Sequence, residues 1–175
     1  MCIRDRYGHP GKKLIFMGGE FAQFSEWSEA RALDWNLLQF NDHINIKNYF
    51  RDLNNLYIKE PALWEKDYDP EGFKWINCDD SEKSIVSFVR RSISDTLIFI
   101  CNFTPNTYNY FKLGVPIQGV YKEIFNSDDT KYGGSNVINC DDILTNKMEC
   151  DGFENSLLIK VPPLAVSVLK WYGKK

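Results

Sequence analysis

The sequence predicts a mixed fold in two parts: the last strand-helix unit of a (β/α)8 barrel, followed by an all-β antiparallel sandwich. Three observations support this prediction. A short apolar run bounded by glycines, within residues 11–21, is typical of a strand that is buried on both faces of a parallel sheet. Residues 42–59 then show the period of an amphipathic helix. Beyond Pro61 the period of the apolar residues changes to two, which indicates antiparallel strands.

The apolar core of the first run, residues 14–17, is followed directly by two glycines and a carboxylate. Gly18 and Gly19 allow the backbone to turn sharply at the end of the predicted strand. Glu20 then lies just past the carboxyl end of that strand. In a parallel α/β barrel this is the face that carries the active site. Glu20 is therefore a candidate site residue.

The predicted helix over residues 42–59 carries apolar residues at three- and four-residue spacing. These are Ile46, Tyr49, Phe50, Leu53, Leu56 and Tyr57, and we expect them to pack on a core. Asp42 is expected to cap the start of the helix, and Pro61 to stop the chain shortly after its end. The predicted domain boundary lies at Glu60, Pro61 and Ala62, so that 7–62 forms the end of the barrel and 63–175 the sandwich.

Short segments with alternating apolar residues and turn signals between them predict the strands of the sandwich. They are residues 84–90, 97–103, 109–113, 120–125, 156–161 and 165–169. Phe88 and Phe99 lie in the middle of two of these segments and are predicted core residues. Leu157, Ile159 and Val161 are expected to share the inner face of another.

The composition excludes several classes of function. The net charge is -3 and no Lys/Arg cluster is present, so neither a nucleic acid nor a membrane surface is an expected partner. No apolar run approaches the roughly 20 residues of a membrane span. Five cysteines lie far apart without metal-ligand spacing, and only two histidines are present, so no metal site is predicted. Reduced thiols in a cytoplasmic protein are the simplest interpretation.

Several strings of this sequence resemble the bacterial 1,4-alpha-glucan (glycogen) branching enzymes of the alpha-amylase superfamily. They are GKKLIFMGGEFAQFSEW with ALDWNLLQF, RDLNNLYIKEPALWEKDYDPEGFKWI, SFVRR, ICNFTP, LGVP, NSDDTKYGGSNV and VPPLAVSVLKW. The resemblance runs from about Gly8 to Trp171 and implies the C-terminal part of such an enzyme, with an alpha-amylase-type C-terminal domain. Residues 1–6 match nothing in the family and lack the features of a signal peptide, so we interpret them as foreign sequence.

By this resemblance, the intact enzyme transfers an α-1,4-glucan segment to a 6-hydroxyl and so forms the α-1,6 branches of glycogen. The implied partners are an α-glucan such as glycogen or amylose, and the N-terminal part of the same enzyme. The resemblance implies no metal or organic cofactor. It also places the catalytic carboxylates on earlier barrel strands, so no catalytic residue is predicted in this chain and the chain alone is expected to be inactive.

Two residues are predicted to contact substrate, each with an alternative. Glu20 matches a position outside the catalytic carboxylates, where it would touch substrate or a catalytic side chain, or else anchor the loop through an ion pair with Arg31. Trp27 lies in a long loop over residues 20–35, the kind of segment in which binding residues collect. Its ring either stacks on a glucose unit at a distant subsite or packs against the rim of the barrel.

Two other functions compete with the branching enzyme. One is a hydrolase of the same superfamily, of the trehalose-releasing or isoamylase type, against which the EFAQ…EW…LDW loop argues. The other is a non-catalytic carbohydrate-binding sandwich. It would need an exposed coplanar pair of aromatic rings, and the candidates are Trp64, Trp75, Tyr132 and Trp171.

Overall fold

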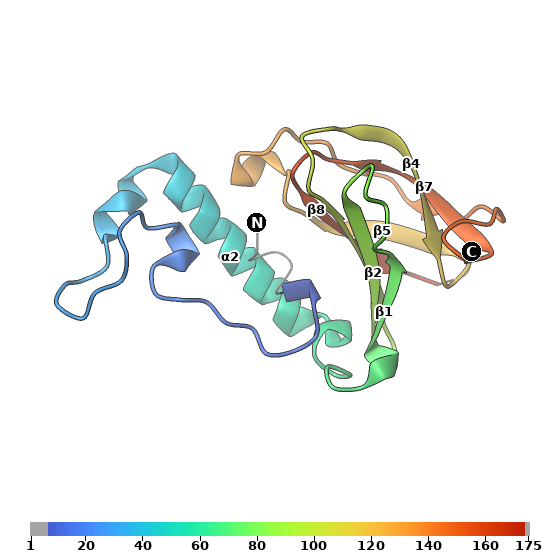
Figure 1. Cartoon of the computed structure of the whole chain (residues 1–175), viewed down its shortest axis with the longest axis horizontal. Coiled ribbons are helices and arrows are strands. Elements are labelled where there is room, and N and C mark those ends of the chain that lie inside the picture. Colours follow the sequence, from blue (N-terminus) through green and yellow to red (C-terminus); the bar gives the residue numbers. More distant parts are fainter. Residues whose placement is uncertain (1–6, 174–175) are drawn as a thin grey trace.

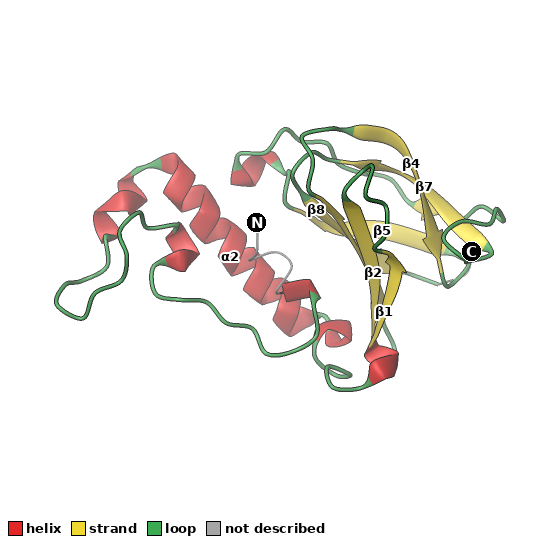
Figure 2. Cartoon of the chain, viewed as in Figure 1, coloured by secondary structure: helices red, strands yellow, loops and turns green. Residues whose placement is uncertain are grey.

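The computed structural model describes residues 7–173, so the predicted foreign segment 1–6 lies outside the described residues. One long helix and two antiparallel sheets are the main elements of this part (Figure 1, Figure 2). The larger sheet has six strands in the order β1-β2-β3-β8-β5-β6, and the smaller sheet pairs β4 with β7. The strands are β1 (Phe73–Asn77), β2 (Ile85–Arg91), β3 (Thr96–Asn102), β4 (Tyr108–Val115), β5 (Val120–Asn126), β6 (Ile143–Leu144), β7 (Asn155–Val161) and β8 (Val166–Trp171). The helices are α2 (Asn41–Lys59) and the short 3-10 turns η1 (Gly19–Phe21), η2 (Trp35–Gln39), η3 (Pro61–Leu63), η4 (Pro70–Gly72) and η5 (Thr130–Tyr132).

The six strands predicted by alternation are all present, as β2, β3, β4, β5, β7 and β8. The prediction missed β1 and β6. Strand β6 has only two residues, too few to show a period. Strand β1 lies at the edge of the larger sheet, where only Ile76 is buried, so its sequence carries no alternation of buried and exposed residues.

The two sheets pack face to face over an apolar core. Leu157, Ile159 and Val161 of β7 are 0%, 2% and 0% exposed, as predicted for the inner face. Opposite them, Ile98 and Ile100 of β3 are completely buried in the same cluster. Every residue of β3 is buried, because the other face of the strand is covered as well.

Helix α2 covers that second face and completes a three-layer arrangement (Figure 1). Phe50, Leu53 and Leu56 of the helix share a cluster with Phe88 and Phe99 of the sheet, which confirms the predicted apolar stripe of the helix and the two predicted core residues. The cluster also contains the buried residues Tyr7, Ala62, Leu63, Leu97, Cys101, Phe125, Val166 and Val168. Residues on both sides of the predicted domain boundary thus lie in one core.

The start of α2 differs from the prediction. Phe40 occupies the N-cap position without a side-chain hydrogen bond, and Asp42 lies in the first turn instead. The carboxylate of Asp42 is still well placed there, since negative charge near the N-terminus of a helix is favoured by the helix dipole.

The strand predicted over residues 14–17 is wrong for this chain. The segment has no regular secondary structure, and Leu14, Phe16 and Met17 are 70%, 64% and 57% exposed. Ile15 alone of this run packs against the helix-facing core. A strand needs a neighbour for its backbone hydrogen bonds, and none of the strands within residues 7–173 pairs with this segment.

The loop that contains Tyr132 and its two glycines has a structural role. Asp128 is buried and accepts hydrogen bonds from the backbone N–H groups of Ser135 and Val137. Gly134 passes so close to it that an added Cβ would lie 2.1 Å from the Asp128 carbonyl oxygen. The loop thereby holds Tyr132 against α2, where its hydroxyl donates to Asp52 Oδ2 at 2.7 Å.

This contact makes part of the stability of the protein depend on pH. Partial burial alone would raise the pKa of Asp52, but hydrogen bonds from Tyr132 and Arg51, with the charges of Arg51 and Lys131, hold it below its usual value. A carboxyl with a lowered pKa stabilises the fold above its unfolded pKa, about 3.9 for Asp, and this contribution is lost as the pH falls through the folded pKa.

Tyr132→Phe is therefore expected to lower the free energy of unfolding by about 1 kcal/mol at pH 7. The difference from the unsubstituted protein should shrink below pH 4, because a protonated Asp52 no longer favours this hydrogen bond. Urea melts at pH 7, 4 and 3 measure both values. Tyr110→Phe, at an 84% exposed position, is the matched control. A difference that is the same at all three pH values would contradict the assigned role of Asp52.

Candidate functional site

The segment that carries both predicted site residues is anchored at η1. Gly18 has a φ of +79°, a conformation that favours glycine and that turns the chain into η1. Phe21 is completely buried beside Trp35, and its carbonyl oxygen lies 2.7 Å from His43 Nδ1 of α2. Glu20 precedes this anchor and is half-buried.

A pocket of about 490 Å³ lies next to this turn. It is lined by Phe16, Met17, Gly18, Gly19, Gln23, Ser25, Glu26 and Trp27. The ring of Trp27 is 39% exposed and meets Phe16 edge-on, with the ring centres 5.8 Å apart. An exposed indole beside amide and carboxylate groups suits a sugar, because the ring can cover the apolar face of a pyranose while polar groups bond its hydroxyls.

The amide of Gln23 gives this pocket its shape. Its Nε2 donates to the carbonyl oxygen of Ser25 at 2.9 Å, and its Oε1 accepts from the backbone N–H of Asp34 at 3.0 Å. The first bond is local, and the second ties residue 23 to residue 34 of the loop. This role could not be predicted, because both partners of Gln23 are backbone groups and Asp34 is brought close only by folding.

The structure brings the two predicted residues into the same segment but not into the same pocket. Trp27 lines the pocket, whereas Glu20 is not among its lining residues. The expected ion pair between Glu20 and Arg31 is not formed within residues 7–173; Arg31 donates to the Glu26 carbonyl oxygen at 2.7 Å instead. A contact between Glu20 and substrate stays a prediction.

Lys13 lies on the chain that leads to this site. Its Nζ donates to the carbonyl oxygens of His9 and Gly11 at 2.6 and 2.8 Å. Burial lowers the pKa of Lys13 to about 8; the charge of Asp67 opposes this shift and that of Arg90 adds to it. These two carbonyl contacts make Lys13 a brace for the turn at residues 9–13.

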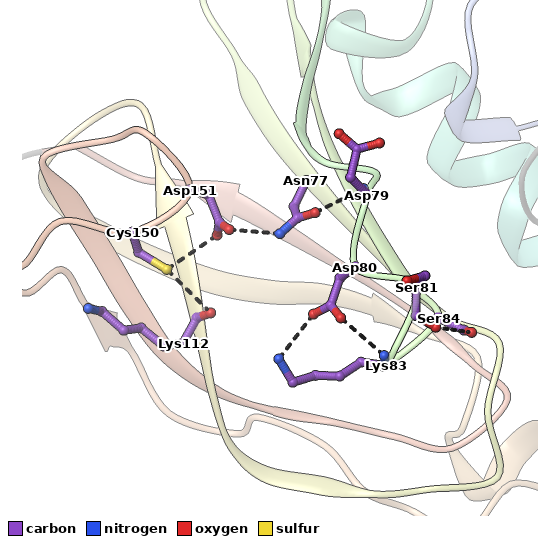
Figure 3. A network of polar contacts seen from close by, with 9 residues as sticks. All are labelled: Asn77, Asp79, Asp80, Ser81, Lys83, Ser84, Lys112, Cys150 and Asp151. Atoms are coloured by element: carbon purple, nitrogen blue, oxygen red, sulfur yellow. Dashed lines mark hydrogen bonds and ion pairs between the residues drawn. The ribbon is translucent and has the colours of Figure 1, made fainter.

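The adjacent carboxylates of Asp79 and Asp80 do not form a second site. In Figure 3 the carboxylates of Asp79 and Asp80 point in different directions, and that of Asp80 meets Lys83 at 3.0 Å. Asp151 accepts from Asn77 Nδ2 and from the backbone N–H of Gly114, and so ties β1 to β4. Within residues 7–173 no group of three His, Cys, Asp or Glu side chains is arranged to hold a metal ion.

The rings that a carbohydrate-binding sandwich would use lie apart from one another. Trp64 and Trp75 are 45% and 42% exposed, so burial does not dismiss them. Tyr132, in contrast, packs against Tyr49 and Phe125. Among the ring contacts of the described residues, none joins two of the four candidate rings.

No helix in residues 7–173 has the length and apolar character needed to span a membrane.

Curated relatives resemble nearly all of this chain. It is 51% identical over 169 residues to the 1,4-alpha-glucan branching enzyme GlgB of Prochlorococcus marinus (strain MIT 9515), covering 95% of this chain and 22% of that protein. The enzyme of the same name from Francisella tularensis subsp. mediasiatica is 51% identical over 166 residues, which is 93% of this chain and 26% of that protein. The chain thus spans about a quarter of the length of the curated relatives it matches.

Among solved structures, AmyP in complex with maltose is similar, with a TM-score of 0.63 over 96% of this chain and 33% of AmyP. At 12% sequence identity this likeness supports the fold alone. Residues 75–172 match the family described as "Alpha amylase, C-terminal all-beta domain". That match covers more than half of the chain and contains every strand from β2 to β8. The chain therefore belongs to the family of alpha-amylase C-terminal all-beta domains.

Proposed function

We propose that this chain is the C-terminal part of a 1,4-alpha-glucan branching enzyme, which acts on glycogen or amylose. The main support is its identity of about one half to curated branching enzymes over 93–95% of the chain. This range extends beyond the matched domain, which begins at residue 75, and takes in most of the segment with the pocket. The rest of the full-length enzyme, with the catalytic carboxylates, is the implied partner.

In the proposed reaction, the anomeric carbon of the donor exchanges its bond to a 4-oxygen for a bond to a 6-oxygen of the acceptor. The acceptor 6-hydroxyl loses its proton, and the 4-oxygen that has lost its bond to the anomeric carbon gains one. Two opposed carboxyl groups perform this exchange in the alpha-amylase manner, one as nucleophile and one as acid and base. The number of reducing ends is unchanged, whereas hydrolysis would create one new reducing end per event.

The test is an assay of the full-length enzyme on amylose. Branching predicts new α-1,6 linkages, detected by a debranching enzyme, with a constant number of reducing ends. A rise in reducing ends without new branches would favour the rival hydrolase. Neither product, in a folded protein that still binds amylose, would favour the non-catalytic sandwich with its exposed Trp64 and Trp75. We also propose a cytoplasmic location, because the five cysteines lie far apart in the sequence and reduced thiols are their simplest interpretation.

Trp27→Ala tests the pocket directly. In the full-length enzyme it is expected to lower kcat/KM for amylose by about tenfold, if the ring stacks on sugar, since such contacts contribute about 1 kcal/mol or more. The melting temperature should stay within a degree or two, because the ring is 39% exposed. Phe24→Ala, at an 83% exposed position of the same loop outside the pocket, is the matched control. Lost stability with unchanged kinetics would show that Trp27 packs rather than binds.

A further inference from the structure

The most deeply buried charge of the described residues belongs to Arg90 of β2, whose side chain is 0% exposed. One of its nitrogens, Nη2, forms an ion pair with Asp67 at 2.7 Å and also donates to the Leu63 carbonyl oxygen at 3.0 Å. The other, Nη1, donates to the carbonyl oxygen of Gly8 at 2.7 Å. A buried charge persists only where such partners replace water. The planar, forked guanidinium is suited to serve three partners at once.

Gly8 is held from a second side. The rings of Phe88 and Phe99 stack with their centres 5.0 Å apart and their planes within 4°. A Cβ added at Gly8 would lie 2.8 Å from atoms of both rings, so the backbone of residue 8 packs directly on this stack. Arg90 therefore fixes a peptide group that the aromatic core already confines. The rings and the guanidinium all belong to the larger sheet. The sandwich therefore fixes the position of Gly8, from which the chain runs towards the pocket.

Between this point and η1 the chain is attached to the rest of the molecule through the side chains of three residues. The ring of His9 lies 5.1 Å from that of Phe73, Lys13 Nζ lies 5.3 Å from the centre of the Tyr57 ring, and Ile15 packs against the core. Leu14, Phe16 and Met17 are exposed, and Phe16 and Met17 line the pocket. The segment from residue 8 to residue 21 is thus held at its two ends, by Arg90 and the adjacent buried Tyr7 at one and by buried Phe21 at the other.

We propose that Arg90 is a positioning residue for glucan transfer, which acts from the sandwich through Gly8 on the segment that carries the pocket. The proposal rests on the proposed function of the full-length enzyme. Arg90 does not touch substrate; its effect is to fix the start of the chain that presents Phe16 and Trp27. Positioning of binding groups matters because displacements of about 1 Å can cost up to about a hundredfold in rate.

The first test uses this chain and does not depend on catalysis. In Arg90→Met with Asp67→Asn, the anchor is removed without leaving an unpaired buried carboxylate. Trypsin cleavage after Lys12 and Lys13 should then become at least about tenfold faster, the effect expected for losing one hydrogen bond to a charged group. The matched control is Lys170→Met with Glu60→Gln, which removes the ion pair of 2.6 Å between β8 and the end of α2 without touching Gly8. Equal acceleration in both variants, or none in the first, would overturn the proposal.

The second test separates positioning from simple neutralisation of charge. Arg90→Lys keeps the charge opposite Asp67, but a single ammonium on a shorter side chain cannot reach Asp67 and Gly8 together. We expect the melting temperature of Arg90→Lys to lie closer to that of the unsubstituted protein than to that of Arg90→Met with Asp67→Asn. The same variant should still show fast trypsin cleavage and, in the full-length enzyme, a kcat/KM for amylose about tenfold below that of the Lys170 control variant.

Recovery of stability, slow cleavage and full activity together in Arg90→Lys would overturn the positioning role. If Arg90→Lys does not fold, the positioning role is decided by kcat/KM for amylose in the full-length enzyme. Arg90→Met with Asp67→Asn is then compared with the Lys170→Met, Glu60→Gln control at equal folded fraction. An inactive full-length enzyme would contradict the proposed function. The trypsin result would still report on the Arg90 anchor, so the two failures are distinguishable.

Discussion

Phe99→Ala is expected to lower the free energy of unfolding by about 3–5 kcal/mol, the range for removing a large buried aromatic ring. Phe99 is 2% exposed and lies in β3, the strand whose seven residues are all buried. Its ring stacks on that of Phe88 and supports the backbone of Gly8. Helix α2 closes the same cluster through Phe50 and Leu53. The cavity would therefore open at the junction of helix and sheet, where several elements cannot all move inward to fill it.

Denaturant melts followed by far-UV circular dichroism measure this loss. Phe88→Ala should behave alike, since Phe88 is also 2% exposed and belongs to the same ring stack. Tyr110→Ala, at an 84% exposed position of β4, is the control and should change the free energy by less than about 0.5 kcal/mol. A loss below about 1 kcal/mol for both phenylalanines would contradict the assignment of this cluster as the core.

The sandwich and the helix could be predicted because each buries one regular face of residues. Alternation in β7 places Leu157, Ile159 and Val161 inward, and three- and four-residue spacing places Phe50 and Leu53 on one side of α2. Both patterns are local, so the sequence alone reveals them. Strands β1 and β6 escaped prediction because one lies at a sheet edge with a single buried residue and the other is too short.

The site was harder to predict, because its determinants are contacts between distant residues. The apolar run over residues 14–17 has the composition of a buried strand, but a strand also requires neighbours, and the strands of the described residues do not pair with it. Phe16 and Met17 therefore face a pocket instead. The burial of Arg90 could not be predicted either, because a charged residue in a strand is usually exposed. Its burial depends on Gly8, Leu63 and Asp67, which no local pattern connects to it.

This chain alone is expected to form no branches in amylose. A retaining glycosyl transfer needs two carboxyl groups on opposite sides of the bond, about 5–5.5 Å apart. Glu26 is the one carboxylate among the lining residues of the pocket beside Trp27, and the half-buried Glu20 lies outside that lining. A single carboxylate cannot act as nucleophile and as acid on opposite faces of a sugar. The closed barrel that holds such a pair in this kind of enzyme also needs eight paired strands, and residues 14–17 form none here.

The measurement is a branch-point assay on the purified chain with amylose, in which a debranching enzyme releases any new side chains. The full-length enzyme serves as the positive control and the heat-denatured chain as the background. We expect the purified chain to match the background, even though its sandwich is folded and Phe99 is buried. Because transfer by enzymes exceeds the uncatalysed reaction by at least about a millionfold, a small residual activity would already be visible. New α-1,6 linkages above the background would show that this chain itself holds a complete pair of catalytic groups, and would contradict the assignment of chemistry to the rest of the enzyme.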